Sequence, residues 1–179
     1  MSNNNNFWKN AMNYGAILGL ALIIYSVVLY LLNFSNARGA GIFSYLILIA
    51  GIIMAIKNYR DKTLGGYMNY GTGLGLGTVI GLFAGILLGF YIFLQMKFID
   101  PDIIEQGFRI QEERMLERGM NEDQVEMPIE MARKFATPVA TAVSTIFFMT
   151  LFGFVVSLIA AAILKKDDDG YNSAMQNIQ

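Results

Sequence analysis

The 179-residue chain contains no cysteine and no histidine. The absence of cysteine excludes disulfides and thiol nucleophiles, and the absence of histidine excludes imidazole acid–base chemistry. Without either residue the usual zinc sites cannot form. Charged residues are also scarce, at 15% of the chain, against about 25% in soluble domains. The net charge of -1 provides no strong basic field for nucleic acid. We therefore expect no cofactor, no metal and no nucleic-acid partner.

Apolar residues are abundant instead, at 55% of the chain with a mean hydropathy of +0.46. They lie in long runs without charge, and a bilayer core about 30 Å thick needs roughly 20 such residues per helix. The sequence therefore predicts an all-α integral membrane protein, a single membrane domain with four transmembrane helices and a helical extramembrane insertion between helices three and four. The predicted spans are residues 11–32, 40–56, 70–96 and 138–164, and the insertion is 97–137.

The first apolar run must be distinguished from a signal peptide. Residues 35–37, Ser-Asn-Ala, resemble a cleavage site. The run 11–32 is longer than the apolar core of about 7–15 residues that signal peptides carry. We expect the first helix to be retained.

The distribution of basic residues predicts the orientation. With four spans, both termini and the segment 57–69 share one side of the membrane. Six basic residues lie there, namely Lys9, Lys57, Arg60, Lys62, Lys165 and Lys166, whereas the short segment 33–39 has only Arg38. In 97–137 acidic residues outnumber basic ones. Because basic residues accumulate on the cytoplasmic face, we expect cytoplasmic termini and 97–137 outside.

The stretch MNYGTGLGLGTVIG, residues 68–81, is unusually rich in glycine. It matches neither the G-x-G-x-x-G dinucleotide pattern nor a Walker loop. Glycine instead recurs at every fourth position through the third run, at Gly73, Gly77, Gly81, Gly85 and Gly89. Each step of four residues turns about 400° around a helix, about 40° more than one full turn. The row of glycines therefore winds slowly around the helix surface. In lipid such a glycine zipper lets two backbones approach closely. The stripe predicts a right-handed crossing or contact with two neighbouring helices.

Small residues recur at the same spacing in two other runs and are candidate partners of this stripe. They are Ala11, Gly15 and Gly19 in the first run and Gly153, Ser157 and Ala161 in the fourth. Close helix packing in membranes favours small residues, so the pattern predicts a compact bundle.

Two segments 56 positions apart are similar, MNYGAILGL at 12–20 and MNYGTGLGL at 68–76. Either a two-helix unit is duplicated, giving a parallel internal repeat, or the match is coincidental. The repeat puts Asn13 and Tyr14 at the cytoplasmic end of one helix and Asn69 and Tyr70 at that of another. These four residues are interface anchors and caps, or they form a shared polar mouth.

The insertion has its own helix signals. Asp100 before Pro101 is typical of a helix start, and Asn121 with Gln124 predicts a capping box. Four apolar residues are expected to line one side of the second helix, namely Val125, Ile129, Ala132 and Phe135. Pro128 is expected to kink or divide this helix.

Several short motifs carry a family resemblance: Tyr59-Arg60-Asp61, Gly65-Gly66-Tyr67, Gly71 and Ile99-Asp100-Pro101. With the four-span layout they resemble an uncharacterised bacterial membrane protein family catalogued as domain of unknown function 4199. The resemblance covers nearly the whole chain. It implies a bacterial inner membrane with 97–137 in the periplasm, and it brings no activity and no catalytic residue.

The spans carry only neutral polar side chains such as Asn13 and Gln95, and ion-coupled pathways usually need intramembrane charge. The leading hypothesis is therefore a non-enzymatic component that binds a partner through 102–136 or supports the envelope, in contact with the lipid bilayer and as a candidate homo-oligomer. The alternative is a small-solute carrier or channel built from two hairpins. An enzyme would depend on Glu112 and Glu113, which fit a solvated helix face better.

Overall fold

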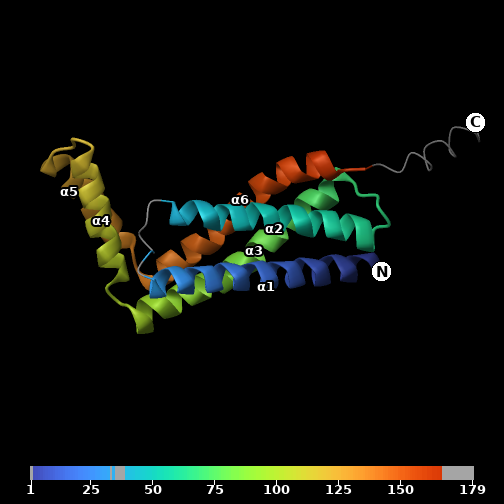
Figure 1. The fold of residues 1–179 in the computed structure, drawn as a ribbon, viewed down its shortest axis with the longest axis horizontal. Coiled ribbons are helices and arrows are strands. Elements are labelled where there is room, and N and C mark those ends of the chain that lie inside the picture. Colours follow the sequence, from blue (N-terminus) through green and yellow to red (C-terminus); the bar gives the residue numbers. More distant parts are fainter. Residues whose placement is uncertain (1, 33, 35–38, 167–179) are drawn as a thin grey trace, which may run out of the picture.

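A computed structural model describes residues 2–32, 34 and 39–166 of the chain. Within these residues the chain is all-helical, as predicted, with no strand. Arg38 and the residues 35–37 lie outside the described part. In chain order the elements (Figure 1) are α1 Ser2–Leu31, α2 Ala40–Thr63, α3 Tyr70–Leu94, the π-helical turn η1 Gln95–Ile99, α4 Ile103–Glu117, α5 Glu122–Phe135 and α6 Pro138–Leu164.

Four helices are long and apolar enough to cross a bilayer, which makes the chain a multi-pass membrane protein. Their apolar segments are Asn6–Leu31, Gly41–Thr63, Tyr70–Ile99 and Pro138–Leu164. Helix α2 continues to Thr63, beyond the predicted span 40–56. The length of an apolar run indicates only the part of a helix that lies in the hydrocarbon core of the bilayer. Backbone hydrogen bonds extend the helix where Lys57, Arg60 and Lys62 can keep their charges in water.

The four long helices lie side by side (Figure 1). The start of α1, the α2–α3 connection and the end of α6 are at one end, and α4 and α5 project from the other. At the first end Met68 and Lys166 exchange two backbone hydrogen bonds of 3.0 Å. Nη1 of Arg60 also donates to the carbonyl oxygen of Leu164 at 3.1 Å. These bonds satisfy carbonyls left open at the end of α6 and join this end to α2 and to the α2–α3 connection.

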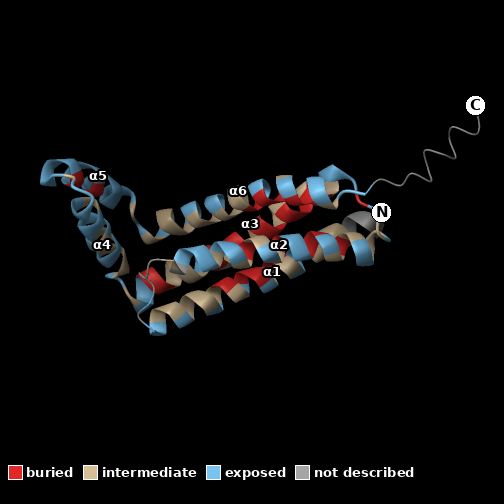
Figure 2. Ribbon diagram, turned by 45° about the horizontal axis from the view of Figure 1, so that its top comes forward, coloured by how far each residue is buried: buried red, intermediate tan, exposed pale blue. Residues whose placement is uncertain are grey.

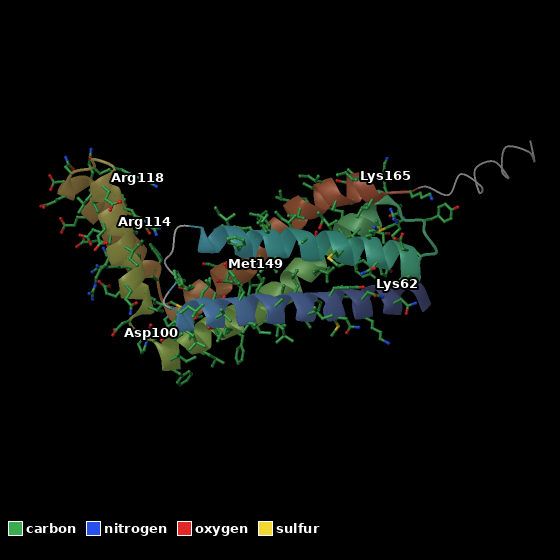
Figure 3. All side chains as sticks on the ribbon, in the orientation of Figure 1. Lys62, Asp100, Arg114, Arg118, Met149 and Lys165 are labelled. Atoms are coloured by element: carbon green, nitrogen blue, oxygen red, sulfur yellow. The ribbon has the colours of Figure 1, made fainter. Side chains whose placement is uncertain are left out.

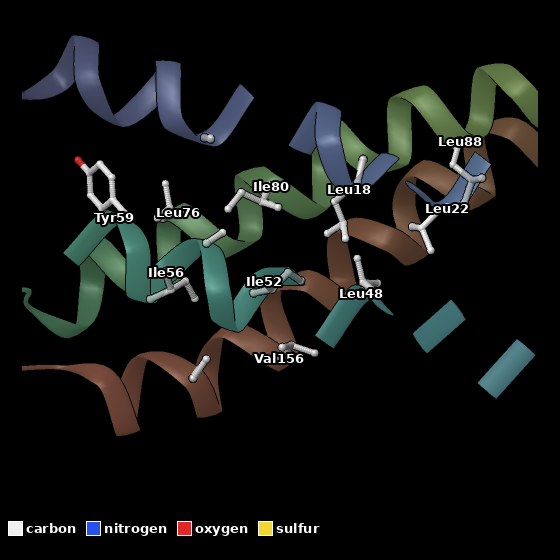
Figure 4. Packing of buried hydrophobic residues seen from close by; sticks show 14 of the residues in the cluster. Leu18, Leu22, Leu48, Ile52, Ile56, Tyr59, Leu76, Ile80, Leu88 and Val156 are labelled. Carbon is white, nitrogen blue, oxygen red and sulfur yellow. The ribbon is translucent and has the colours of Figure 1, made fainter. Parts of the chain in front are cut away.

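Helix α3 is the centre of the bundle. In its most apolar 18-residue window 44% of the residues are buried, against 22%, 22% and 28% in α1, α2 and α6. Figure 4 shows Leu76 and Ile80 of α3 facing Ile52 and Ile56 of α2, with Leu18 of α1 nearby. The buried residues gather on the inner faces (Figure 2), while α4 and α5 are largely exposed. In lipid this packing is maintained by dispersion contacts and not by water exclusion.

The insertion differs from the prediction at its start. Asp100 is not a helix N-cap: its N–H donates to the carbonyl oxygen of Gln95 at 2.8 Å, which closes η1. Helix α4 begins only at Ile103. The capping box of α5 is present as predicted, since Oδ1 of Asn121 accepts from the Gln124 N–H at 2.9 Å and Oε1 of Gln124 accepts from the Asn121 N–H at 3.2 Å. Pro128 lies inside α5 and does not divide it.

Candidate functional site

The glycine row of α3 lies against α6. All five glycines are buried. A Cβ atom added at Gly81 would lie 2.8 Å from the carbonyl oxygen of Met149 and 3.1 Å from Cα of Gly153. At Gly89 it would lie 2.9 Å from the carbonyl oxygen of Ala142. No real Cβ tolerates backbone contacts below 3.0 Å, so the two backbones approach as closely as glycine permits.

The same contact continues along the rest of the row. Added Cβ atoms at Gly73 and Gly85 would lie 3.0 Å from Cβ of Ala161 and 2.9 Å from Cβ of Met149. One at Gly77 would contact the Ser157 hydroxyl. That hydroxyl is fully buried and donates to the carbonyl oxygen of Gly153 at 2.6 Å. The glycine row of α3 therefore faces mainly α6, although a side-chain carbon of Ile52 in α2 would also lie 3.0 Å from a Cβ at Gly77.

A different face of α3 receives α1. A Cβ added at Gly15 would lie 3.1 Å from the carbonyl oxygen of Ile80, and one at Gly19 would lie 3.3 Å from Cα of Ala84. The sequence analysis did not single out Gly51 of α2, where a Cβ would contact the side chain of Leu18. Gly51 and the buried Ala55 are four residues apart, so the spacing of small residues could have identified this position.

The two MNYG segments occupy different local positions. Asn69 is the N-cap of α3, where its Oδ1 accepts from the Thr72 N–H at 2.8 Å. Asn13 lies well inside α1 and is exposed. Tyr14 is half-buried beside the core and Tyr70 is 37% exposed. No hydrogen bond among the described residues joins the first pair to the second. The shared polar mouth therefore stays a prediction.

Helix α5 presents an exposed apolar stripe that the sequence analysis missed. Met127, Met131 and Phe135 recur at intervals of four and are 69%, 56% and 74% exposed. On the other side Val125 and Ile129 are buried, at 2% and 5% exposure. The prediction that Phe135 shares their side is wrong, because ten residues of helix bring it nearer to the methionines.

Polar contacts join α5 to α4. Nη2 of Arg133 forms an ion pair with Oε1 of Glu105 at 2.8 Å, and its guanidinium lies 5.8 Å from the centre of the Phe108 ring. Both charged side chains are partly exposed, so we expect the pair to contribute about 0–1 kcal/mol. The burial of Val125 and Ile129 contributes more, about 1.5–3 kcal/mol for each side chain.

Acidic residues gather beside this contact. A cavity of about 340 Å³ between α4 and α5 is lined in part by Glu112, Glu122, Glu126 and Glu130. Among the described residues no group of three or more Asp or Glu side chains is arranged to hold a metal ion. Glu113, the second carboxylate considered for catalysis, is exposed on α4. The chemistry that this cavity offers is a group of carboxylates beside the buried Val125 and Ile129.

Comparison with known proteins identifies one family. The model of the family described as Protein of unknown function (DUF4199) matches residues 13–166. These residues include the four spans from within α1 to the end of α6 and the insertion. No curated protein matches the chain, and no solved structure matches it.

Proposed function

The chain belongs to the family described as Protein of unknown function (DUF4199), and from this premise we propose that it is a non-enzymatic multi-pass membrane protein that binds another envelope protein. The binding segment is 102–136, which contains α4 and α5. The four-helix bundle anchors this segment and holds it at one face of the membrane.

The observation that carries the proposal is the stripe of Met127, Met131 and Phe135. Large apolar side chains three or four positions apart on one face are the anchors by which a helix binds in a groove of a partner. Methionine adapts its shape to such a groove. These side chains have no cover among the described residues, because the opposite side of α5 already packs on α4 through Val125 and Ile129.

The charges that adjoin the stripe in sequence are of both signs. Glu126 and Glu130 precede the two methionines, and the exposed Lys134 precedes Phe135. A groove with an apolar floor and a rim that carries both basic and acidic groups would complement them. Opposite charge across an interface accelerates association, and this effect weakens as salt rises. Binding should therefore be faster at low ionic strength.

The proposed location is a bacterial inner membrane, with both termini in the cytoplasm and 97–137 in the periplasm. Figure 3 supports this orientation: Lys62 and Lys165 lie at the end of the bundle opposite to Asp100, Arg114 and Arg118. Basic residues close to the ends of spans favour the cytoplasm. The mixed and net acidic charge of the insertion is compatible with export.

Site-specific photo-crosslinking in native membranes tests the proposal. A photoreactive amino acid at position 131 should give one dominant adduct with another protein. The same amino acid at position 113, on α4, serves as the control and should not give this adduct. Replacing Met127 and Phe135 with Ser in the crosslinking variant should abolish the adduct, because two of the three anchors are lost.

Three results would contradict this function. They are adducts at background level, adducts with lipid alone, and an adduct with a second copy of this chain. The last would identify the α5 stripe as a homo-oligomer interface.

A further inference from the structure

A lateral groove runs along the bundle between α2, α3 and α6. Its volume is about 540 Å³, and its lining includes Tyr45 of α2, Ile92 of α3 and a series of α6 residues from Thr141 to Val155. The rings of Tyr45 and Phe152, both in the lining, pack against each other with their centres 5.0 Å apart. Two residues of its lining, Phe148 and Leu151, are 63% and 45% exposed. The groove therefore opens on the outside of the spans, where the surrounding medium is hydrocarbon.

A second cavity continues the groove towards α4. Its volume is about 370 Å³, and it lies where α3 and η1 meet α4. Ile92 and Thr141 line both spaces. This junction cavity also has two amides, from Gln95 and Gln111, and none of its lining residues is charged. The combined space is apolar within the spans and hydrogen-bonding at the membrane surface.

Gln95 is the polar residue placed to bind a ligand. The residue is only 8% exposed. Among the described residues no buried side-chain nitrogen or oxygen lacks a hydrogen-bond partner, so the Gln95 amide, for which no hydrogen bond to a described residue is seen, stays accessible from the cavity. Gln95 begins the π-helical turn η1, which ends the third span. Its amide lines the junction cavity, where a bound molecule can reach it.

We infer that this continuous space binds a membrane glycerolipid. One acyl chain lies in the lateral groove, and an ester carbonyl of the lipid accepts a hydrogen bond from the Gln95 amide in the junction cavity. The ester region of a lipid lies just outside the hydrocarbon core, which is the depth at which α3 meets α4. Because no charged side chain lines the junction cavity, the charge of the lipid head group does not affect binding.

Native mass spectrometry of the detergent-purified full chain tests this inference, with phosphatidylcholine or phosphatidylglycerol added as probe. The chain should retain one lipid of either kind with similar affinity. Gln95→Leu keeps the side-chain size and should weaken binding about three- to tenfold, the effect of one hydrogen bond. Ser144→Trp fills the groove and should abolish binding. Val143→Trp is the matched control: Val143 is 60% exposed on the same helix and does not line the groove.

The inference is overturned if the parent chain retains no lipid, or if Val143→Trp reduces binding as much as Ser144→Trp. It is also overturned if Gln95→Leu binds like the parent, or if only phosphatidylglycerol is retained, since the latter means a charged site elsewhere. Circular dichroism of each variant confirms that its helices are intact. The result is independent of the partner bound by α5, because the stripe residues line neither cavity.

Discussion

Gly81 of α3 and Gly153 of α6 meet backbone to backbone. A Cβ on either residue would lie 3.0–3.1 Å from Cα of the other. At this position neither helix can gain even a methyl group without moving its neighbour. Dispersion contacts weaken steeply with separation, so a shift of the two helices at this point would be felt along the whole row. We propose that these glycines set the stability of the bundle.

Alanine at Gly81 should therefore destabilise the protein. We expect Gly81→Ala to lower the free energy of unfolding by about 1–3 kcal/mol, the usual cost of overpacking. Gly75→Ala in the same helix is the control, because its Cβ would meet nothing nearer than the Phe7 ring at 3.7 Å. Its higher helix propensity should be neutral or stabilising by up to about 1 kcal/mol. Unfolding in mixed detergent micelles measures the free energy of unfolding of the two variants. Equal values for Gly81→Ala and Gly75→Ala would contradict the proposal.

Asn121 caps the N-terminal end of α5. Asn121→Ala removes the capping box of α5 and should destabilise that helix by about 1 kcal/mol. Hydrogen exchange at the α5 amides should accelerate roughly fivefold, the equivalent of this energy, while exchange in α3 is unchanged. Asn121→Ser, which can still accept from the Gln124 N–H, should restore most of the protection. Unchanged exchange in the alanine variant would show that packing alone holds α5.

At the scale of helices, apolar length was sufficient to predict the four spans. It was not sufficient for their ends, because backbone hydrogen bonding continues into water, as α2 does to Thr63. Local cap patterns gave mixed results. Asn121 and Gln124 form the predicted box, but the Asp100 N–H is taken by Gln95 in the wide turn that ends the third span. A pattern for one helix start cannot reveal that the preceding helix competes for the same residue.

The sequence also did not reveal which face of each helix packs against which neighbouring helix. The four-residue spacing of glycine left one partner or two open. The structure shows that the row faces mainly α6, while α1 packs on Ile80 and Ala84. Similarly, the exposed stripe of α5 and the burial of Gln95 depend on where α4 lies. That placement arises from tertiary contacts that no local pattern encodes.

The two sides of α5 should respond differently to the same charge. Ile129→Asp places a carboxylate in the α4–α5 contact, and an unpaired buried charge is strongly destabilising. We expect α5 to separate from α4 and trypsin to cleave after Arg133 or Lys134 at least tenfold faster. Met131→Asp puts the charge on the exposed stripe and should leave cleavage unchanged but abolish the partner adduct.

Limited proteolysis and crosslinking of the two variants measure these effects. If Met131→Asp also exposes the trypsin sites, the stripe stabilises the hairpin itself, and its assignment as a partner surface is wrong.

For the whole molecule, four spans put the start of α1 and the end of α6 on the same side of the membrane, because an even number of crossings returns the chain to that side. The bonds of Arg60 to Leu164 and of Met68 to Lys166 hold three segments together at one end. The α4–α5 segment is at the other end (Figure 1). The duplication of MNYG remains a prediction, since Asn13 and Asn69 differ in local position. The proposed binding of an envelope partner by the α5 stripe requires the α4–α5 end to face outward.

Cysteine labelling tests this orientation, because the chain has no cysteine of its own. Tyr67 in the α2–α3 connection and Leu116 on α4 are 44% and 41% exposed, and each is replaced by cysteine in a separate variant. In intact bacterial spheroplasts a membrane-impermeant maleimide should label the Leu116→Cys variant. It should label the Tyr67→Cys variant only after permeabilisation. Equal labelling of both variants before permeabilisation, or labelling of Tyr67→Cys alone, would contradict the proposed arrangement.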